Sequence, residues 1–392
     1  MTVTKRESMT INMGPQHPAT HGVLRIELDI EGETVIDARP IIGYLHTGIE
    51  KNMEAKTYTQ ALTMTDRMDY MAPMSNNLVY VGAIEKLMEV EIPPRAEYVR
   101  VIMTELTRIA SHLVWLGTHA IDIGAMSMLL YCFREREKIV QMYEFVSGVR
   151  MMSSYFRVGG LAGDIPPGFY ERVKDILDTF PARISEYEDL LTNNRIWLNR
   201  TVGVGTISAE DAIDAGFSGP NLRGSGVAWD IRKSNPYSYY NKFEFDIPTG
   251  KNGDVYDRYK VRMEEMRQSL RIVGQAVEGI PEGPYITEDR KIALPPKSEV
   301  LQGMEQLIHH FKIVVHGFTP PEGDIYFSIE SPKGEIGCYI VSDGTKKPYR
   351  VHFRPPSFVN ISALPKLVIG RMVADVIACI GSLDIVLGEI DR

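Results

Sequence analysis

The chain contains few cysteines, and their positions exclude several classes of protein. Three occur in 392 residues, far apart and without a CxxC pair: Cys132, Cys338 and Cys379. Cysteines in this arrangement provide neither a disulfide framework nor a self-contained metal cage. We therefore expect a protein of a reducing, cytoplasmic compartment.

The sequence also lacks an apolar segment typical of targeting or membrane insertion. The first residues, MTVTKRESMTINMG, contain no apolar signal core. The most apolar C-terminal stretch, residues 363–381, is interrupted by Lys366, Arg371 and Asp375. Because a spanning helix needs about 20 mainly apolar residues, we expect no segment of the chain to cross a membrane.

Positive charge is in short supply. Lys and Arg total 43 against 51 for Asp and Glu, which gives a formal net charge of −8, and no long basic run is present. Because phosphate binding depends on clustered Lys and Arg, we expect no nucleic-acid partner. The rest of the composition, 44% hydrophobic and 24% charged, is typical of a folded protein.

Common nucleotide-binding and catalytic motifs are absent as well. Neither GxGxxG nor a P-loop occurs, so the chain is not expected to bind a nucleotide by itself. There is no HExxH and no nucleophile elbow. His17 and His21 of HPATH have the i, i+4 spacing of a zinc pair, but the segment contains a proline and precedes a strand, which disfavours a metal site.

Hydrophobic periodicity divides the chain into β and helical regions. Alternating polar and apolar residues in GVLRIELDI predict a sheet in the first 45 residues. From about residue 50 to 200 the pattern is helical, and in residues 96–126 apolar side chains recur every three or four positions. A further helix, a hairpin around SPKG, another strand in KKPYRVHFRPPSF and a helix from about Leu364 to Ser382 follow.

These patterns predict an α+β fold with a central helical bundle, a small N-terminal β domain and a C-terminal β-containing region. The predicted division is 1–48 for the β domain, 49–200 for the bundle and 253–392 for the C-terminal helices and hairpin. Residues 201–252, rich in Gly, Ser, Asn and Pro, have little periodicity. Since a stretch of this length in a compact domain is usually functional or a docking surface, we interpret it as an interface segment.

Several polar residues stand where a purely structural helix would not need them. They are His17 and His21 in a turn rich in Gly and Pro, Arg67, Asp69 and Tyr70 after an apolar run, and His119 and Asp122 within an apolar helix. From the pattern alone, capping and interhelical hydrogen bonding account for them better than a functional site does.

A family resemblance favours a functional role for these polar residues. The strings NMGPQHPATHGVLR, IGYLHTGIEKNME, TDRMDYMAPMSNN, ELTRIASHLVWLGTHAIDIGAM, FREREK, SGVRMMSSYFRVGG, LRGSGVAWDIRK and GEIDR follow one another from about residue 10 to the end of the chain. In order and spacing they resemble the D-subunit family of bacterial NADH:quinone oxidoreductase, respiratory complex I. This family is in turn similar to the large subunit of nickel-iron hydrogenases, which implies a hydrogenase-like fold.

The hydrogenase resemblance also bears on metal binding. Two cysteine pairs hold the metal in hydrogenases, whereas the matching positions here are Asp69 and Ala72 in RMDYMA, and Val386 and Glu389 in LDIVLGE. No thiolate remains to hold nickel, so we expect no metal ligand in this chain.

Membership of the D-subunit family implies a quinone pocket between this chain and the iron–sulfur (B) subunit of the complex. In the resemblance, Tyr70 and His21 match the side chains that hydrogen-bond the two quinone carbonyls, and Asp122 matches the carboxylate paired with that histidine. His17 and Met71 are expected in the same pocket.

Quinone reduction takes two electrons and two protons. The electrons would come from the iron–sulfur cluster of the B subunit, so this chain needs only proton donors. Tyr and His suit that task, with reference pKa values near 10 and about 6.5.

The resemblance further implies partners and a location. The B, C and I subunits and the membrane-embedded H subunit would surround this chain, which would be held peripherally on the cytoplasmic side of the cell membrane. Its reaction would be coupled to proton translocation. Whether NADH, ferredoxin or a deazaflavin supplies the electrons stays open, because the input module lies on other chains.

Two positions depart from the family pattern. Thr47 stands where the family often has the arginine of YLHRG, and Met152 where it has the histidine of RMHAAY; both positions lie near the terminal cluster in the family. Without these groups the reduced cluster is stabilised less, which favours menaquinone over ubiquinone as the acceptor.

Two other functions stay open: a hydrogenase-related metal enzyme, and a non-catalytic scaffold with a vestigial pocket.

Overall fold

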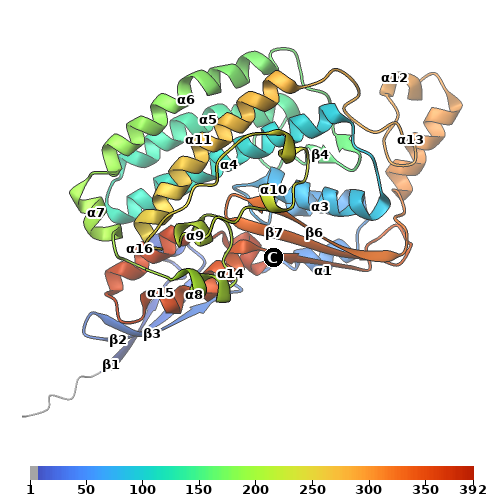
Figure 1. Ribbon diagram of the computed structural model, residues 1–392. Coiled ribbons are helices and arrows are strands. Elements are labelled where there is room, and N and C mark those ends of the chain that lie inside the picture. Colours follow the sequence, from blue (N-terminus) through green and yellow to red (C-terminus); the bar gives the residue numbers. More distant parts are fainter. Residues whose placement is uncertain (1–7) are drawn as a thin grey trace, which may run out of the picture.

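The computed structural model describes residues 8–392 and is built around a layer of long helices (Figure 1). They are α4 (Pro94–Ile123), α5 (Ser127–Ser147), α6 (Phe169–Leu191) and α11 (Val255–Gly279), which pack side by side. The apolar positions of α4 predicted to face the core, such as Val99, Ile102 and Leu106, are fully buried. The predicted α+β fold with a helical bundle is therefore confirmed.

A second layer places a sheet beneath the helices. The strands β6 (Gly323–Ser331), β7 (Gly334–Ser342) and β8 (Arg350–Arg354) form an antiparallel sheet in that order. The predicted SPKG hairpin is the β6–β7 turn, and α3 (Pro73–Met88) packs across both strands. Residues far apart in the sequence thus meet between α3 and this turn.

The N-terminal sheet packs against the C-terminal end of the chain. The strands β1 (Ser8–Met13), β2 (Arg25–Glu31) and β3 (Thr34–Ile41) are antiparallel, and alternate residues of β2 are buried. Those residues share one core with α15 (Leu364–Val368) and α16 (Val373–Leu383). The two ends of the described chain are therefore held together.

The structure gives details of two helical regions that the sequence pattern does not. The single helix expected from Leu364 to Ser382 is broken between α15 and α16, because Gly370 has φ +80° and the peptide groups of residues 370–371 bond to Val35 of β3. The region after residue 48 forms two helices, α1 (Ile49–Glu54) and α2 (Tyr58–Thr65), because Thr57 caps the second.

The remaining elements are short, apart from α13. They are η1 (Pro18–Thr20), β4 (Phe156–Arg157), β5 (Gly160–Leu161), α7 (Arg195–Thr201), α8 (Ala209–Asp214), α9 (Gly219–Gly224), α10 (Ile231–Ser234), η2 (Tyr240–Lys242), α12 (Lys297–Val300), α13 (Met304–His316), α14 (Pro356–Ser362) and α17 (Leu387–Asp391). The centre of the 201–252 segment, around α9, is buried within this chain, so its apolar and charged groups pack internally. An interface role for its exposed residues, like the predicted domain boundaries, stays a prediction.

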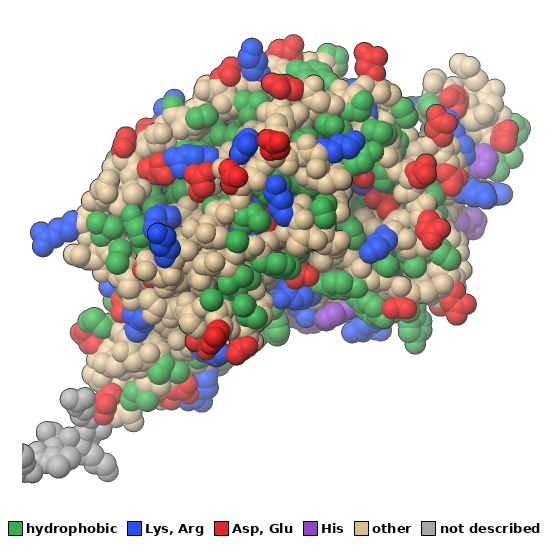
Figure 2. All heavy atoms as spheres, viewed as in Figure 1, with side chains coloured by type: hydrophobic (Ala, Val, Ile, Leu, Met, Phe, Trp, Pro, Cys, Tyr) green, Lys and Arg blue, Asp and Glu red, His purple; other side chains and the backbone are tan. Residues whose placement is uncertain are grey.

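The α12–α13 region projects from the body of the molecule (Figure 1). Figure 2 shows hydrophobic and His side chains sharing the surface there, and Leu301, Met304 and Phe311 are exposed. Within residues 8–392, no helix is both long and apolar enough to cross a membrane.

Candidate functional site

Tyr70 lies in a tight turn, residues 66–72, between α2 and α3. The turn is fixed around Asp69, whose Oδ1 accepts a hydrogen bond from the backbone N of Met71 (3.0 Å) and whose carbonyl accepts one from Asn76 Nδ2 (3.1 Å). Pro73 then begins α3. Tyr70 itself is half-buried, and burial followed by the Asp69 charge raises its pKa above the usual 10.0, against the opposing effect of Lys333.

A mostly apolar cavity of about 520 Å³ lies beside Tyr70. Its lining comes from the loop before α1, from α1 and α2, from the turn, from residues 151–152 and from the C-terminal tail: Leu45, Thr47, Ile49, Asn52, Met64, Arg67, Tyr70, Met151, Met152 and Gly388. The structure therefore brings together three residues predicted from the sequence, Thr47, Tyr70 and Met152. A cavity of this size and character suits a small aromatic ligand.

The C-terminal tail holds the wall of this cavity in place. Asp391 of α17 accepts hydrogen bonds from the backbone N of Gly43 (2.8 Å) and of Leu45 (2.7 Å), and Arg392 pairs with Glu50 (2.9 Å). Figure 1 shows the C-terminus inside the molecule, next to α14. The GEIDR end of the chain is thus part of the site.

His21 follows the short helix η1 and adopts the left-handed conformation, with φ 55°. Its side chain keeps accessible surface although protein atoms surround it, as expected for a residue in a concave part of the surface. This desolvation lowers its pKa below 6.5, while Asp384 raises it and Lys333 lowers it further. His21 does not line the 520 Å³ cavity, nor does Met71.

The histidine that acts on Asp122 is His17. Burial raises the pKa of Asp122 to about 6, and the opposing charge comes from His17. The groups that act on His21 are Asp384 and Lys333 instead. His17, the residue before η1, and the end of α4 therefore lie within electrostatic range, and the expected pairing of His21 with Asp122 stays a prediction. HPATH forms a 3₁₀ turn, so the helical zinc-pair spacing does not apply.

Behind Tyr70 lies a buried lysine. Lys333, in the β6–β7 turn, is fully buried; its Nζ lies 3.0 Å from Asp69 Oδ2 and 3.9 Å from Asp384 Oδ2, and it donates to Ser111 Oγ (2.9 Å). It lowers the pKa of both Tyr70 and His21, so one buried ammonium lies within electrostatic range of both side chains. Sequence reasoning missed this residue, because a lysine in a hairpin turn is normally solvated.

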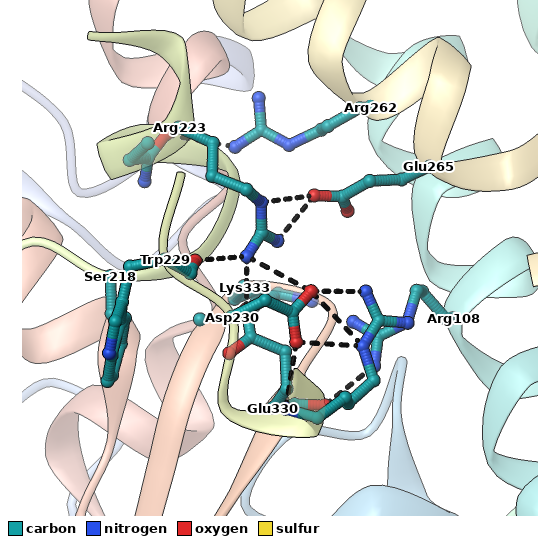
Figure 3. A network of polar contacts seen from close by, with 12 residues as sticks. Arg108, Ser218, Arg223, Trp229, Asp230, Arg262, Glu265, Glu330 and Lys333 are labelled. Carbon is teal, nitrogen blue, oxygen red and sulfur yellow. Dashed lines mark hydrogen bonds and ion pairs between the residues drawn. The ribbon is translucent and has the colours of Figure 1, made fainter. Parts of the chain in front are cut away.

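Beyond Lys333 extends a larger network of buried ion pairs (Figure 3). Arg223 donates to Glu265 (3.0 Å) and Glu330 (2.8 Å), and Arg108 donates to the carbonyl of Ser331 (3.0 Å). Burial alone would raise the pKa of Glu105 in the same network, but Arg108 and Arg232 lower it to about 2. Arg223 and Arg232 come from the LRGSGVAWDIRK motif, so two of its charged side chains are buried inside the chain.

A larger cavity, about 590 Å³, lies elsewhere, between α2, α3 and residues 284–297. None of the residues predicted for the quinone site lines it.

Among residues 8–392, no three His, Cys, Asp or Glu side chains gather in a way that could hold a metal ion. His119, another candidate, is buried between Trp115 and Trp197, where burial lowers its pKa to about 3.

Comparison with known proteins agrees with the resemblance found in the sequence. Residues 122–392 match the family described as respiratory-chain NADH dehydrogenase, 49 Kd subunit. The chain is 60% identical to the NADH-quinone oxidoreductase D subunit numbered 2 in Chloroflexus aurantiacus, over 99% of this chain and 95% of that protein. It is 59% identical to the NADH-quinone oxidoreductase D subunit of Geotalea uraniireducens and 57% identical to that of Geobacter sulfurreducens, over 98% of this chain and 99% of each relative. The chain therefore belongs to the D-subunit family of NADH-quinone oxidoreductases, the 49 Kd subunit of respiratory complex I, and is one part of that multi-subunit enzyme.

Proposed function

We propose that this chain forms, together with the iron–sulfur (B) subunit, the pocket in which quinone is reduced to quinol, coupled to proton translocation. The observation that supports this most is the 520 Å³ cavity. Thr47, Tyr70 and Met152, which are distant in the sequence, line it together with apolar side chains. An apolar cavity with one phenol hydroxyl fits a quinone ring, which needs a flat apolar space and a donor for its carbonyl oxygen.

The protein's task in this reaction is to supply two protons. Tyr70 donates its hydroxyl hydrogen to one quinone oxygen, and His21 is the proposed donor to the other; two electrons arrive from the cluster of the B subunit. The buried ammonium of Lys333 assists both donors, because a nearby positive charge stabilises a tyrosinate and a neutral imidazole. Asp122, with His17, and Met71 complete the proposed site.

The proposal includes the surroundings of the chain. The B, C and I subunits and the membrane-embedded H subunit are its proposed neighbours, with the chain on the cytoplasmic face of the cell membrane and attached through them. Menaquinone is the proposed acceptor, because Thr47 and Met152 leave the cluster without two groups that could raise its potential. A hydrogenase-like reaction is disfavoured because Asp69, Ala72, Val386 and Glu389 replace the four cysteines.

Substitution of the two donors tests the site. In the assembled complex we expect Tyr70→Phe and His21→Ala each to lower quinone reduction by at least about tenfold, since each removes a proton donor. Reduction of an artificial acceptor upstream of the quinone should keep its parental rate. The matched control is Tyr256→Phe, which removes a half-buried hydroxyl on α11, outside the cavity.

The same variants decide between the quinone site and a scaffold role. Normal assembly with parental quinone reduction in both Tyr70→Phe and His21→Ala would reject the assignment and favour a vestigial pocket. Stoichiometric nickel in the purified complex would instead favour the metal enzyme.

A further inference from the structure

A cluster of four buried ionisable side chains lies next to Tyr70. Lys333 is surrounded by Asp69 at 3.0 Å and Asp384 at 3.9 Å, and Glu389 of α17 lies within electrostatic range of Lys333 and Asp69. Lys333 is 0% exposed, and Asp69 and Glu389 are each 1% exposed. We call Asp69, Lys333, Asp384 and Glu389 the lysine cluster.

The charges of the lysine cluster do not balance when every group is ionised. One ammonium faces three carboxyl groups, and an uncompensated buried carboxylate is so costly that it takes up a proton. Within residues 8–392, Asp69 Oδ2 and Asp384 Oδ2 accept no hydrogen bond and are compensated through their ion pairs with Lys333. At least one carboxyl group of the cluster should therefore be protonated at neutral pH.

Of the three carboxyl groups, Glu389 is the one whose surroundings favour the protonated form. Asp69 and Asp384 lie within 4 Å of the ammonium, whereas Glu389 accepts a hydrogen bond from the backbone N of Ser357 (3.1 Å). Burial and the Asp69 charge raise the pKa of Glu389 to about 8, against the opposing effect of Lys333.

Glu389 is the chain neighbour of a residue that packs against the Tyr70 turn. Its neighbour Gly388 lies directly against the turn: a Cβ atom there would be 3.4 Å from the Tyr70 ring and 2.5 Å from the carbonyl oxygen of Met68. Asp69, whose charge raises the pKa of Glu389, is the residue before Tyr70 in the chain. Asp69 thus links the cluster directly to the turn that carries the proposed donor, and Glu389 is linked to that turn through Gly388.

We propose that Glu389 holds an exchangeable proton in the lysine cluster and returns it to Tyr70 after Tyr70 has protonated the quinone. This inference rests on the proposed function. The Tyr70 O–H bond breaks as the quinone oxygen takes its proton; the Glu389 proton then moves to the tyrosinate, and the resulting carboxylate is stabilised by Lys333. Glu389 is later reprotonated from solvent. It acts through Tyr70 and is a positioning residue that does not touch quinone.

The charged groups around Glu389 determine the sign of the pH effect. They are Asp69 from the turn, Lys333 from the β6–β7 hairpin, Asp384 after α16, and Asp391 and Arg392 in its own tail, of which Arg392 pairs with Glu50. Because the pKa of Glu389 is raised, the stored proton is present below about pH 8 and is lost above it. Quinone reduction should therefore fall on the alkaline side.

The test compares pH profiles of quinone reduction in the assembled complex. Glu389→Gln keeps the acceptor for Ser357 but cannot hold or release a proton. We expect a turnover about tenfold lower at pH 7, a KM for quinone within about twofold of the parent, and loss of the alkaline decline. Glu389→Asp, which still titrates, should restore an alkaline decline at a displaced pH.

An unchanged alkaline decline in Glu389→Gln would overturn the inference, whatever the turnover. If Glu389→Gln does not assemble, Glu389→Asp decides: a decline at the parental pH would show that another group titrates. Tyr70→Phe, measured in parallel, separates the two proposals. Parental activity in Tyr70→Phe rejects Tyr70 as the proton donor, whereas a loss there with a parental profile in Glu389→Gln rejects only the stored proton.

Discussion

At the scale of single residues, Thr47 and Met152 carry information on the electron acceptor. Both line the cavity with Tyr70, so the two family departures face the same space. Neither side chain can contribute a positive charge or a proton linked to reduction. We therefore expect the terminal cluster of the complex to have a low midpoint potential that is insensitive to pH, which suits menaquinone.

A redox titration of that cluster at two pH values checks this prediction. The matched variants Thr47→Arg and Met152→His should each raise the midpoint, and Met152→His should also make it depend on pH. A high parental midpoint that shifts by about one proton per electron would contradict the prediction, because a redox-linked group would then be present despite Met152.

The residue scale also shows what the sequence could and could not predict. Tyr70, Thr47 and Met152 were identified from motifs, and the structure gathers them around one cavity. Lys333 and Asp384 were not, because nothing in a turn lysine or a tail aspartate indicates burial. The effect of His17 on Asp122 could not be predicted for a related reason: HPATH offers two histidines, and the conformation of η1 determines where each one lies.

At the scale of elements, the site depends on a close approach between α17 and the 66–72 turn. Gly388 has no space for a side chain, since a Cβ would lie 2.5 Å from a backbone carbonyl oxygen. Gly388→Ala should therefore push the Tyr70 turn away from the tail, and we expect quinone reduction to fall by about a hundredfold, as for a misplaced catalytic group.

Gly274→Ala is the matched control, because Gly274 lies in α11 and, apart from its chain neighbours and the nearby backbone of its own helix, no atom of the described residues comes within 4 Å of the added Cβ. That change should leave activity unchanged and stabilise the helix by about 0.5–1 kcal/mol. Both variants are measured by steady-state quinone reduction at equal amounts of assembled complex. Equal activity in Gly388→Ala and Gly274→Ala would show that the approach is not needed.

Element prediction from the sequence was accurate where periodicity decides the outcome. The alternation in β2 and the three- and four-residue spacing in α4 correspond to buried faces. The break between α15 and α16 could not be predicted, because it depends on long-range hydrogen bonds with Val35 and on the positive φ of Gly370. Local patterns do not contain such contacts.

At the scale of the whole molecule, the buried ion network joins the helical layer to the C-terminal sheet. Arg223 donates to Glu265 on α11 and to Glu330 on β6, and all three side chains are fully buried. Arg223→Met would leave three buried carboxylates, Glu265, Glu330 and Asp230, without this partner, so we expect the free energy of unfolding to fall by about 3–5 kcal/mol. Less assembled complex and a lower melting temperature should follow.

Arg271→Met provides the comparison on the same helix. Arg271 pairs with exposed Asp246 at 3.0 Å, and exposed pairs contribute about 0–1 kcal/mol. If Arg223→Met and Arg271→Met assembled equally well and melted at the same temperature, the buried network would not support the fold in the way proposed.

The central claim, that quinone takes a proton from Tyr70, is tested most directly by the rate at which quinone reoxidises the terminal cluster. After rapid mixing of the assembled complex with electron donor and the native quinone, the cluster should become reduced at the parental rate in Tyr70→Phe. Its reoxidation should be at least about tenfold slower than in the parent and in Tyr256→Phe, because only that step needs the proton. Parental reoxidation in Tyr70→Phe would contradict the claim.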